Sequence, residues 1–333
     1  VTTSVSVDHA TPAAFYAHVE KRGEQYVIGT QLVESGFDFF AGSDFVRPDN
    51  PVEGGPDLYA QAKAKGYTIA KGYKNYRKLS KNADKMILFQ SDAANKVDHG
   101  SLPYAIDKGK DDLSLADVTR AAINFLVGKQ GSKDGLFLMV EGGKIDYACH
   151  ANDTPAALHD VMDFDQAVRV AYEFYQQHPD ETLIVVAADH ETGGLVMGTG
   201  GALPLENLRY ANMSVAKLGR ELHKLHDKYG EKYSFDVVKN FLSDNFGLWT
   251  KLELNEKQNN RLETAFNHIA EGKGQDSQSL YQKDDELADA VKRVLTEKSN
   301  LVWASSAHSA GYVPVFAVGV GAENFTGRMD NTD

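Results

Sequence analysis

Continuous apolar runs alternate with stretches of helical periodicity along much of this 333-residue chain. The runs at 135–140, 182–188 and 313–319 lack the polar-apolar alternation of a half-exposed strand, and the first two flank a helical pattern over 154–177. Uninterrupted apolar strands that alternate with helices are typical of a parallel sheet covered on both faces. The pattern therefore predicts an α/β fold, a three-layer sandwich with a largely parallel central sheet and helices on both faces.

Shorter elements are expected toward the N-terminus. Thr11 and Pro12 suit the N-cap and the first residue of a helix. An amphipathic helix is expected from Asp112 to about Val127. Strands are expected at 37–43, at 86–89 and at 1–7, where Val1, Val5 and Val7 alternate with hydroxyl residues.

The composition of the sequence changes between about residues 200 and 302. This segment is polar and lysine-rich, with amphipathic helical patterns at 215–225 and 286–295. It separates runs that belong to one sheet. We therefore interpret it as a helical cap inserted into a single domain of residues 1–333 rather than as an independent domain.

The amino-acid composition argues against several functional classes. The chain has 47 acidic and 35 basic residues, a balance that repels nucleic acid and phosphate esters unless bound cations reverse the sign locally. We expect no nucleic acid as a specific ligand. Cys149 is the single cysteine, so no intrachain disulfide is possible. Since no apolar run reaches the roughly 18 residues of a membrane span, a soluble protein is expected.

Unusual polar residues follow the predicted strands. They are His9 and Thr11 after the first strand, Glu141, Asp146 and His150 after the second, Asp189 and His190 after the third, and His308 before the last. Ligands gather beyond the carboxyl ends of strands in open parallel sheets. These side chains are therefore candidates for one shared site.

Their chemistry suits metal ions. Asp146 and His150 are four residues apart, so on a helix they share one face, and His308 would add a third ligand while leaving a position open, as in catalytic zinc sites. Asp189-His190 offers an oxygen and a nitrogen to a second transition metal. Glu141 and Thr11 offer hard oxygens that suit magnesium.

Each residue alone has an ordinary structural explanation. Thr11 is a plausible helix cap, His9 a half-buried polar residue, Asp189-His190 a turn, and the Asp146–His150 pair a solvated helix face. Glu191, Tyr147 and His159 are interpreted as structural. The convergence favours metal binding, because carboxylates and histidines at successive strand ends are costly to hold together without a cation.

The same segments resemble the alkaline phosphatase family of bacterial type. They are residues 9–22, 140–153, 188–194 and 308–311. The resemblance implies two zinc ions and one magnesium ion. Asp146, His150 and His308 match the ligands of one zinc, Asp189 and His190 those of the other, and Thr11 and Glu141 those of magnesium. His9 and Tyr147 occupy positions that vary among family members, and their identities imply magnesium held partly through water and histidine rather than by an extra carboxylate. Arg22 matches the arginine that grips phosphate oxygens.

The resemblance further implies hydrolysis of phosphate monoesters through a phosphoserine, with small phosphate monoesters and inorganic phosphate as partners. It also implies broad specificity, a homodimer, and a periplasmic or secreted location. Related metallohydrolases of the same fold, such as a sulfatase, a phosphodiesterase or a phosphoglycerate mutase, remain alternatives. A non-catalytic metal-binding fragment is another.

The sequence departs from the family pattern in its catalytic residues and at its C-terminus. The metal-bridging aspartate and the nucleophile, in an Asp-Ser-Ala segment, should precede Val1, and this sequence contains neither. Ser91-Asp92-Ala93-Ala94 inverts the serine and the aspartate, so it is not taken as the nucleophile. Relatives also continue beyond Asp333 into a last helix. We therefore expect a chain truncated at both ends that cannot form phosphoserine and binds the second zinc weakly.

Overall fold

The computed structural model describes residues 1–333 except 93–100, 130–134, 329 and 331–333. Its main sheet has five strands in the order β3-β4-β2-β1-β5, and all four pairings are parallel. The expectation of a parallel sheet within an α/β fold is confirmed. The strands are β1 (Thr2–Thr3), β2 (Phe39–Gly42), β3 (Tyr67–Lys71), β4 (Lys85–Phe89) and β5 (Val140–Glu141).

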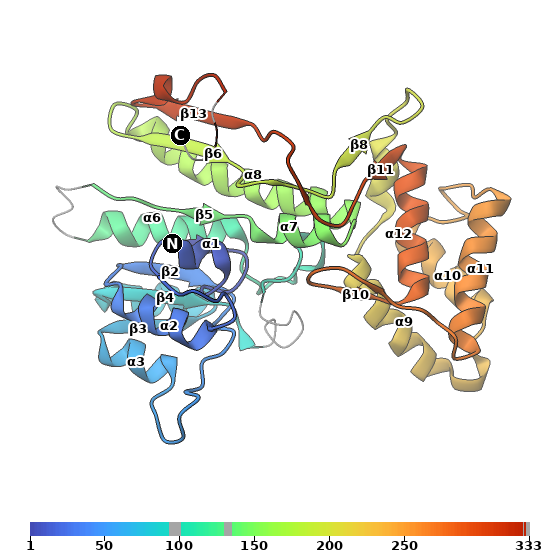
Figure 1. The fold of residues 1–333 in the computed structure, drawn as a ribbon, viewed down its shortest axis with the longest axis horizontal. Coiled ribbons are helices and arrows are strands. Elements are labelled where there is room, and N and C mark those ends of the chain that lie inside the picture. The colour runs from blue at the N-terminus through green and yellow to red at the C-terminus, as the bar shows by residue number, and fades with distance from the viewer. Residues whose placement is uncertain (93–100, 130–134, 329, 331–333) are drawn as a thin grey trace.

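Helices cover both faces of this sheet, as Figure 1 shows. Along β4, Met86 and Leu88 pack on one face with α6 (Leu115–Gly128), while Ile87 and Phe89 pack on the other with α2 (Gln25–Glu34) and α3 (Leu58–Ala64). The long helix α8 (Thr154–Gln177) lies beside α6, and α4 (Tyr73–Leu79) follows β3. The strands β2 and β4 are buried along almost their whole length, as expected of strands covered on both faces. In the apolar runs at 182–188 and 313–319, by contrast, Leu183, Val185 and Phe316 are exposed, so burial on both faces does not explain these runs.

The first strand is central and shorter than expected. Only Thr2–Thr3 forms β1, between β2 and β5, although residues 1–8 are all buried. The chain then bends, because the backbone N–H of Val7 bonds to Asp44 O and that of Val5 to Thr3 Oγ1. Residues 4–9 therefore run at the carboxyl end of the sheet, where a site is expected.

The final apolar run does not join the parallel sheet. Strand β13 (Val315–Gly319) pairs antiparallel with β6 (Leu183–Ala187), in a separate two-stranded sheet packed on α8. The prediction that this run has the same parallel character was wrong. The order of apolar residues along a run does not encode strand direction, which the return path of the chain decides.

The helix after the first strand is also shorter than expected. Helix α1 spans only Ala10–Ala14, His9 is its N-cap residue, and Thr11 lies inside its first turn. The prediction that Thr11 caps this helix was wrong, and Arg22 lies beyond the end of the helix. The chain leaves the helix because Tyr16 donates a 2.6 Å hydrogen bond to Val7 O and the backbone N–H of His18 bonds to Gln31 Oε1 instead of continuing the helical ladder.

The segment expected as an insertion leaves and re-enters the core through β8 (Leu195–Met197) and β11 (Leu301–Trp303), which pair antiparallel. It gathers on one side of the molecule, at the right of Figure 1, around a separate apolar core. Its elements are α9 (Val215–Tyr229), α10 (Phe235–Phe246), α11 (Glu256–Ala270), α12 (Glu286–Lys298), and the hairpin β9 (Ser277–Gln278) with β10 (Lys283–Asp284).

The buried ammonium of Lys292 ties this segment to the core. It donates to Ala151 O at 2.7 Å and to Asp284 at 2.9 Å. Ala151 directly follows α7 (Gly143–His150), the helix that carries the predicted ligands. Within the described ranges, no helix is both long and apolar enough to cross a bilayer.

Candidate metal centre and phosphate site

Three predicted ligands converge at the carboxyl end of the sheet. One potential ligand atom from each of Asp146, His190 and His308 lies within 4.8 Å of the other two. They come from three separate elements: α7, the turn after β6, and β12 (His308–Ser309). The antiparallel pairing of β12 with β7 (Glu191–Thr192) brings His308 opposite Thr192. Residues separated by more than 160 positions thus meet in one cluster.

Helix α7 carries Asp146 and a second predicted ligand, His150, beside it. Because Asp146 and His150 are four residues apart, they share a face, and His150 Nε2 lies 3.4 Å from Asp146 Oδ1. His308 Nε2 lies 3.6 Å from the same oxygen. The expectation of a shared helical face is confirmed by these distances.

Hydrogen bonds fix which nitrogen of His150 faces the cluster. Nδ1 lies 2.6 Å from the carbonyl oxygen of Ser306, which can only accept, so Nδ1 carries the proton. Nε2 then presents its lone pair, 3.1 Å from His308 Nε2. Two imidazole nitrogens and a carboxylate oxygen that converge in this way fit a divalent transition metal.

The Asp189-His190 pair lies against the same cluster. The ring of His190 stacks on His308 with centroids 3.6 Å apart, and its Nε2 is 3.3 Å from Asp189 Oδ2. The Asp189 side chain is 70% exposed, so it faces the open side of the cluster. An oxygen and a nitrogen are thus available to a second ion beside the first.

Two threonines surround Glu141. Thr3 Oγ1 donates to Glu141 Oε2, and the Thr11 hydroxyl also bonds to this carboxyl group. Burial raises the pKa of Glu141 above its ordinary value, the two hydroxyls oppose this rise, and the nearby Asp189 and Asp146 add to it. The predicted pair Thr11 and Glu141 is therefore in contact, as a set of hard oxygens that suits Mg²⁺.

His9 and Arg22 form the second half of the site. Arg22 Nη2 lies 2.9 Å from His9 Nε2, and the Tyr147 hydroxyl lies 3.1 Å from the same nitrogen. Burial, with help from Arg22, lowers the pKa of His9 to about 4. His9 is thus neutral at physiological pH, and its buried Nδ1 has no hydrogen-bond partner among the described residues.

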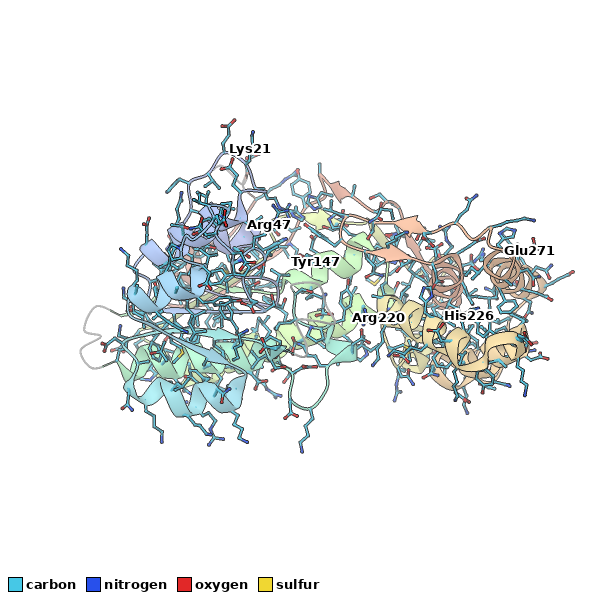
Figure 2. The ribbon with its side chains drawn as sticks, turned by 90° about the horizontal axis from the view of Figure 1, so that it is seen from below. Lys21, Arg47, Tyr147, Arg220, His226 and Glu271 are labelled. Atoms are coloured by element: carbon cyan, nitrogen blue, oxygen red, sulfur yellow. The ribbon has the colours of Figure 1, made fainter. Side chains whose placement is uncertain are left out.

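Several contact residues escaped the sequence analysis. Thr192 Oγ1 donates to Asp146 Oδ1 at 2.7 Å, and Tyr147, interpreted as structural, contacts His9. Tyr281 comes from the insertion, where no motif was recognised, yet it accepts a 2.9 Å hydrogen bond from Arg22. Figure 2 shows Tyr147 on helix α7, at the side of the molecule that faces the insertion. No spacing rule in the sequence signals these contacts, since each joins distant elements.

Two further residues with reactive side chains, Asp92 and Cys149, take no part in the cluster. Asp92, in the segment with inverted serine and aspartate, forms an ion pair with Lys71, while Ala93 and Ala94 lie outside the described residues. Burial raises the pKa of the Cys149 thiol to about 12, so this unpaired cysteine stays protonated and is a poor metal ligand.

Known proteins are similar to this chain in sequence and in fold. The sequence profile of the alkaline phosphatase family matches residues 48–333. Alkaline phosphatases 4 and 3 of Bacillus subtilis (strain 168) are each 30% identical to this chain over 98% of its length. The matched regions cover 63% and 64% of those two proteins, so this chain spans slightly less than two thirds of their length.

Solved structures agree with the sequence match. A cold-active alkaline phosphatase from the psychrophile Shewanella sp. has a TM-score of 0.76 at 26% identity, over 99% of this chain and 72% of that one. The alkaline phosphatase of Thermus thermophilus has a TM-score of 0.70 at 25% identity, over 96% of this chain and 65% of that one. Both similarities extend over nearly the whole chain.

Proposed function

Because this chain belongs to the alkaline phosphatase family, we propose that it binds two zinc ions and one magnesium ion and serves the hydrolysis of phosphate monoesters. The convergence of Asp146, His190 and His308 within 4.8 Å carries the proposal. His150 and Asp189 complete the zinc ligands. Thr11 and Glu141 would hold magnesium together with His9, and water would supply part of its coordination.

A pair of such ions supplies Lewis-acid stabilisation of the attacking and leaving oxygens of a phosphoryl group. The protein's own residues prepare the site for this task. Ser306 fixes the tautomer of His150, and Thr192 orients Asp146. Arg22 is exposed at the rim, where its planar guanidinium is available to phosphate oxygens.

The exposure of the site supports binding of phosphate monoesters formed from a broad range of alcohols. Asp189 and Arg22 are both exposed, so a phosphoryl group can reach the cluster while most of its ester group stays in solvent. Small phosphate monoesters and inorganic phosphate are therefore the proposed partners. Homodimer formation and a periplasmic or secreted location are proposed from the family alone.

Metal and phosphate binding give the first test. The chain should bind two zinc ions, and the zinc-loaded chain should then bind inorganic phosphate, as measured by calorimetry. Asp146→Asn should lose zinc, and Arg22→Ala should keep zinc but bind phosphate more weakly. Zinc binding without any phosphate binding would leave only a metal-binding module and contradict the proposal.

Substrate choice gives the second test. The zinc-loaded chain should bind phosphate monoesters more tightly than bis-p-nitrophenyl phosphate or p-nitrophenyl sulfate, and chelator should abolish this binding. Preference for the diester or the sulfate would favour a related metallohydrolase.

A further inference from the structure

We propose that Tyr281, in the loop of the β9–β10 hairpin, is a positioning residue that holds Arg22 ready for phosphate. The insertion would thereby contribute to phosphate affinity through one hydroxyl group. This inference rests on the proposed function, because it assigns a partner to the phosphate-binding arginine of the same site.

Arg22 needs such a partner. It is exposed and lies outside the helices, so its long side chain would otherwise sample many rotamers and lose that freedom on binding phosphate. Its Nη2 donates to Tyr281 at 2.9 Å and lies 2.9 Å from His9 Nε2. These two contacts come from elements separated by most of the chain, and together they hold the guanidinium beside His9.

Tyr281 is itself held against the core. Its ring stacks on Tyr147 with centroids 3.8 Å apart and an interplanar angle of 11°. It also makes an edge contact with the ring of His150 at 5.4 Å and a tilted contact with His9 at 5.9 Å. Because stacked and edge-to-face rings have preferred geometries, the hydroxyl is fixed at one position above the site.

The hairpin that carries Tyr281 is anchored on both sides. Within the loop, the backbone N–H of Ser279 bonds to Gln282 O at 2.8 Å, and Gln282 Oε1 accepts a 3.2 Å hydrogen bond from Tyr104. At the base, Asp284 binds the buried Lys292, which also holds Ala151 O beside α7. The insertion thus places Tyr281 with reference to the same helix that carries Asp146 and His150.

A purely structural role is the competing explanation, since the Tyr147 stack alone would hold the hairpin in place. The two roles use different parts of the side chain. The stack uses the ring, whereas Arg22 contacts only the hydroxyl oxygen. Tyr281→Phe keeps the ring and removes the acceptor, so it separates the two roles.

The test measures the affinity of the zinc-loaded 333-residue chain for inorganic phosphate by calorimetry. Tyr281→Phe should weaken phosphate binding roughly three- to tenfold with unchanged zinc content, because a hydrogen bond to a charged group on an exposed side chain is lost. In an Arg22→Ala background, Tyr281→Phe should have no further effect. Tyr229→Phe, which removes a hydroxyl from α9 of the same insertion, should bind phosphate like the wild type.

Two results would overturn the inference: wild-type phosphate affinity in Tyr281→Phe, or an equal loss of affinity in both Arg22 backgrounds. Unchanged thermal unfolding of Tyr281→Phe establishes that the hairpin remains folded. Failure of the proposed function would give a different result from failure of this inference. If the proposed function is wrong, the wild-type chain itself does not bind phosphate.

Discussion

Thr192 and Asp146 lie 46 residues apart, and the Thr192 hydroxyl donates a 2.7 Å hydrogen bond to Asp146 Oδ1. The same hydroxyl oxygen is 3.2 Å from His190 Nδ1. Since the hydroxyl hydrogen goes to Asp146, the Nδ1–H of His190 is the donor to Thr192, and Nε2 of His190 is left as the potential metal ligand. One threonine thus orients two proposed ligands at once.

Thr192→Val should therefore lower zinc affinity without removing a ligand. The substitution keeps the shape of the side chain but frees the Asp146 carboxylate and the His190 ring, and loss of such a supporting contact typically costs about 10-fold or more in metal affinity. Competition with a chromophoric chelator measures the change. An unchanged zinc affinity would show that Asp146 and His190 hold their positions without Thr192.

His308→Ala should weaken zinc binding further, by at least about 100-fold, because a proposed ligand is lost outright. His308 Nε2 lies 3.1 Å from His150 Nε2 and 3.6 Å from Asp146 Oδ1, so no neighbour replaces it without moving. The matched control is His226→Ala, on the surface of α9, whose side chain is 63% exposed. Equal zinc affinities of the two variants would remove His308 from the metal centre.

Lys292→Ala should destabilise the folded chain by about 3–5 kcal/mol, because it leaves buried Asp284 without its cation. Burial lowers the pKa of Lys292, but Asp284 and Asp289 outweigh this and raise it above its ordinary value. Urea unfolding at neutral pH measures the loss. Lys224→Ala, which breaks an exposed pair with Glu221, should cost less than about 1 kcal/mol. Equal costs would show that Lys292 does not anchor the insertion.

Asp8→Asn should change how stability depends on pH. Burial raises the pKa of Asp8 from 3.8 to about 6. Hydrogen bonds from the Val46 N–H and from Ser6 lower this pKa, but burial outweighs them. Because the folded chain binds this proton more tightly than the unfolded chain, its free energy of unfolding falls as pH rises through this interval and then levels off. The asparagine variant should lack this fall and be more stable by on the order of 2 kcal/mol at mildly alkaline pH.

Urea unfolding in chelator at several pH values between 4 and 8 tests this prediction. The control is Asp111→Asn, at an exposed position, which should follow the wild-type curve. Burial also raises the pKa of Asp153 and of Asp160 to about 7, so the comparison with Asp8→Asn is decisive. If the stabilities of the wild type and Asp8→Asn change in parallel across the interval, Asp8 does not carry the buried charge that its surroundings imply.

The sequence alone determined the class of fold and most of the candidate ligands. Helix α8 spans Thr154–Gln177, as its periodicity predicted, and β4 covers the predicted run at 86–89. Asp146 and His150 share a face because helical geometry fixes positions four residues apart. Such local rules need no knowledge of the rest of the chain, so they can be applied to the sequence directly.

The tertiary structure decided everything that depends on which distant segments meet. It placed β13 antiparallel to β6, ended α1 at Ala14 before Arg22, and brought Tyr281 from the insertion onto that arginine. Strand direction, helix termination by side-chain hydrogen bonds and contacts across an insertion all depend on the path of the chain through space. Since residue spacing carries no record of that path, local patterns could predict the proposed ligands of this site but not the residues proposed to orient them.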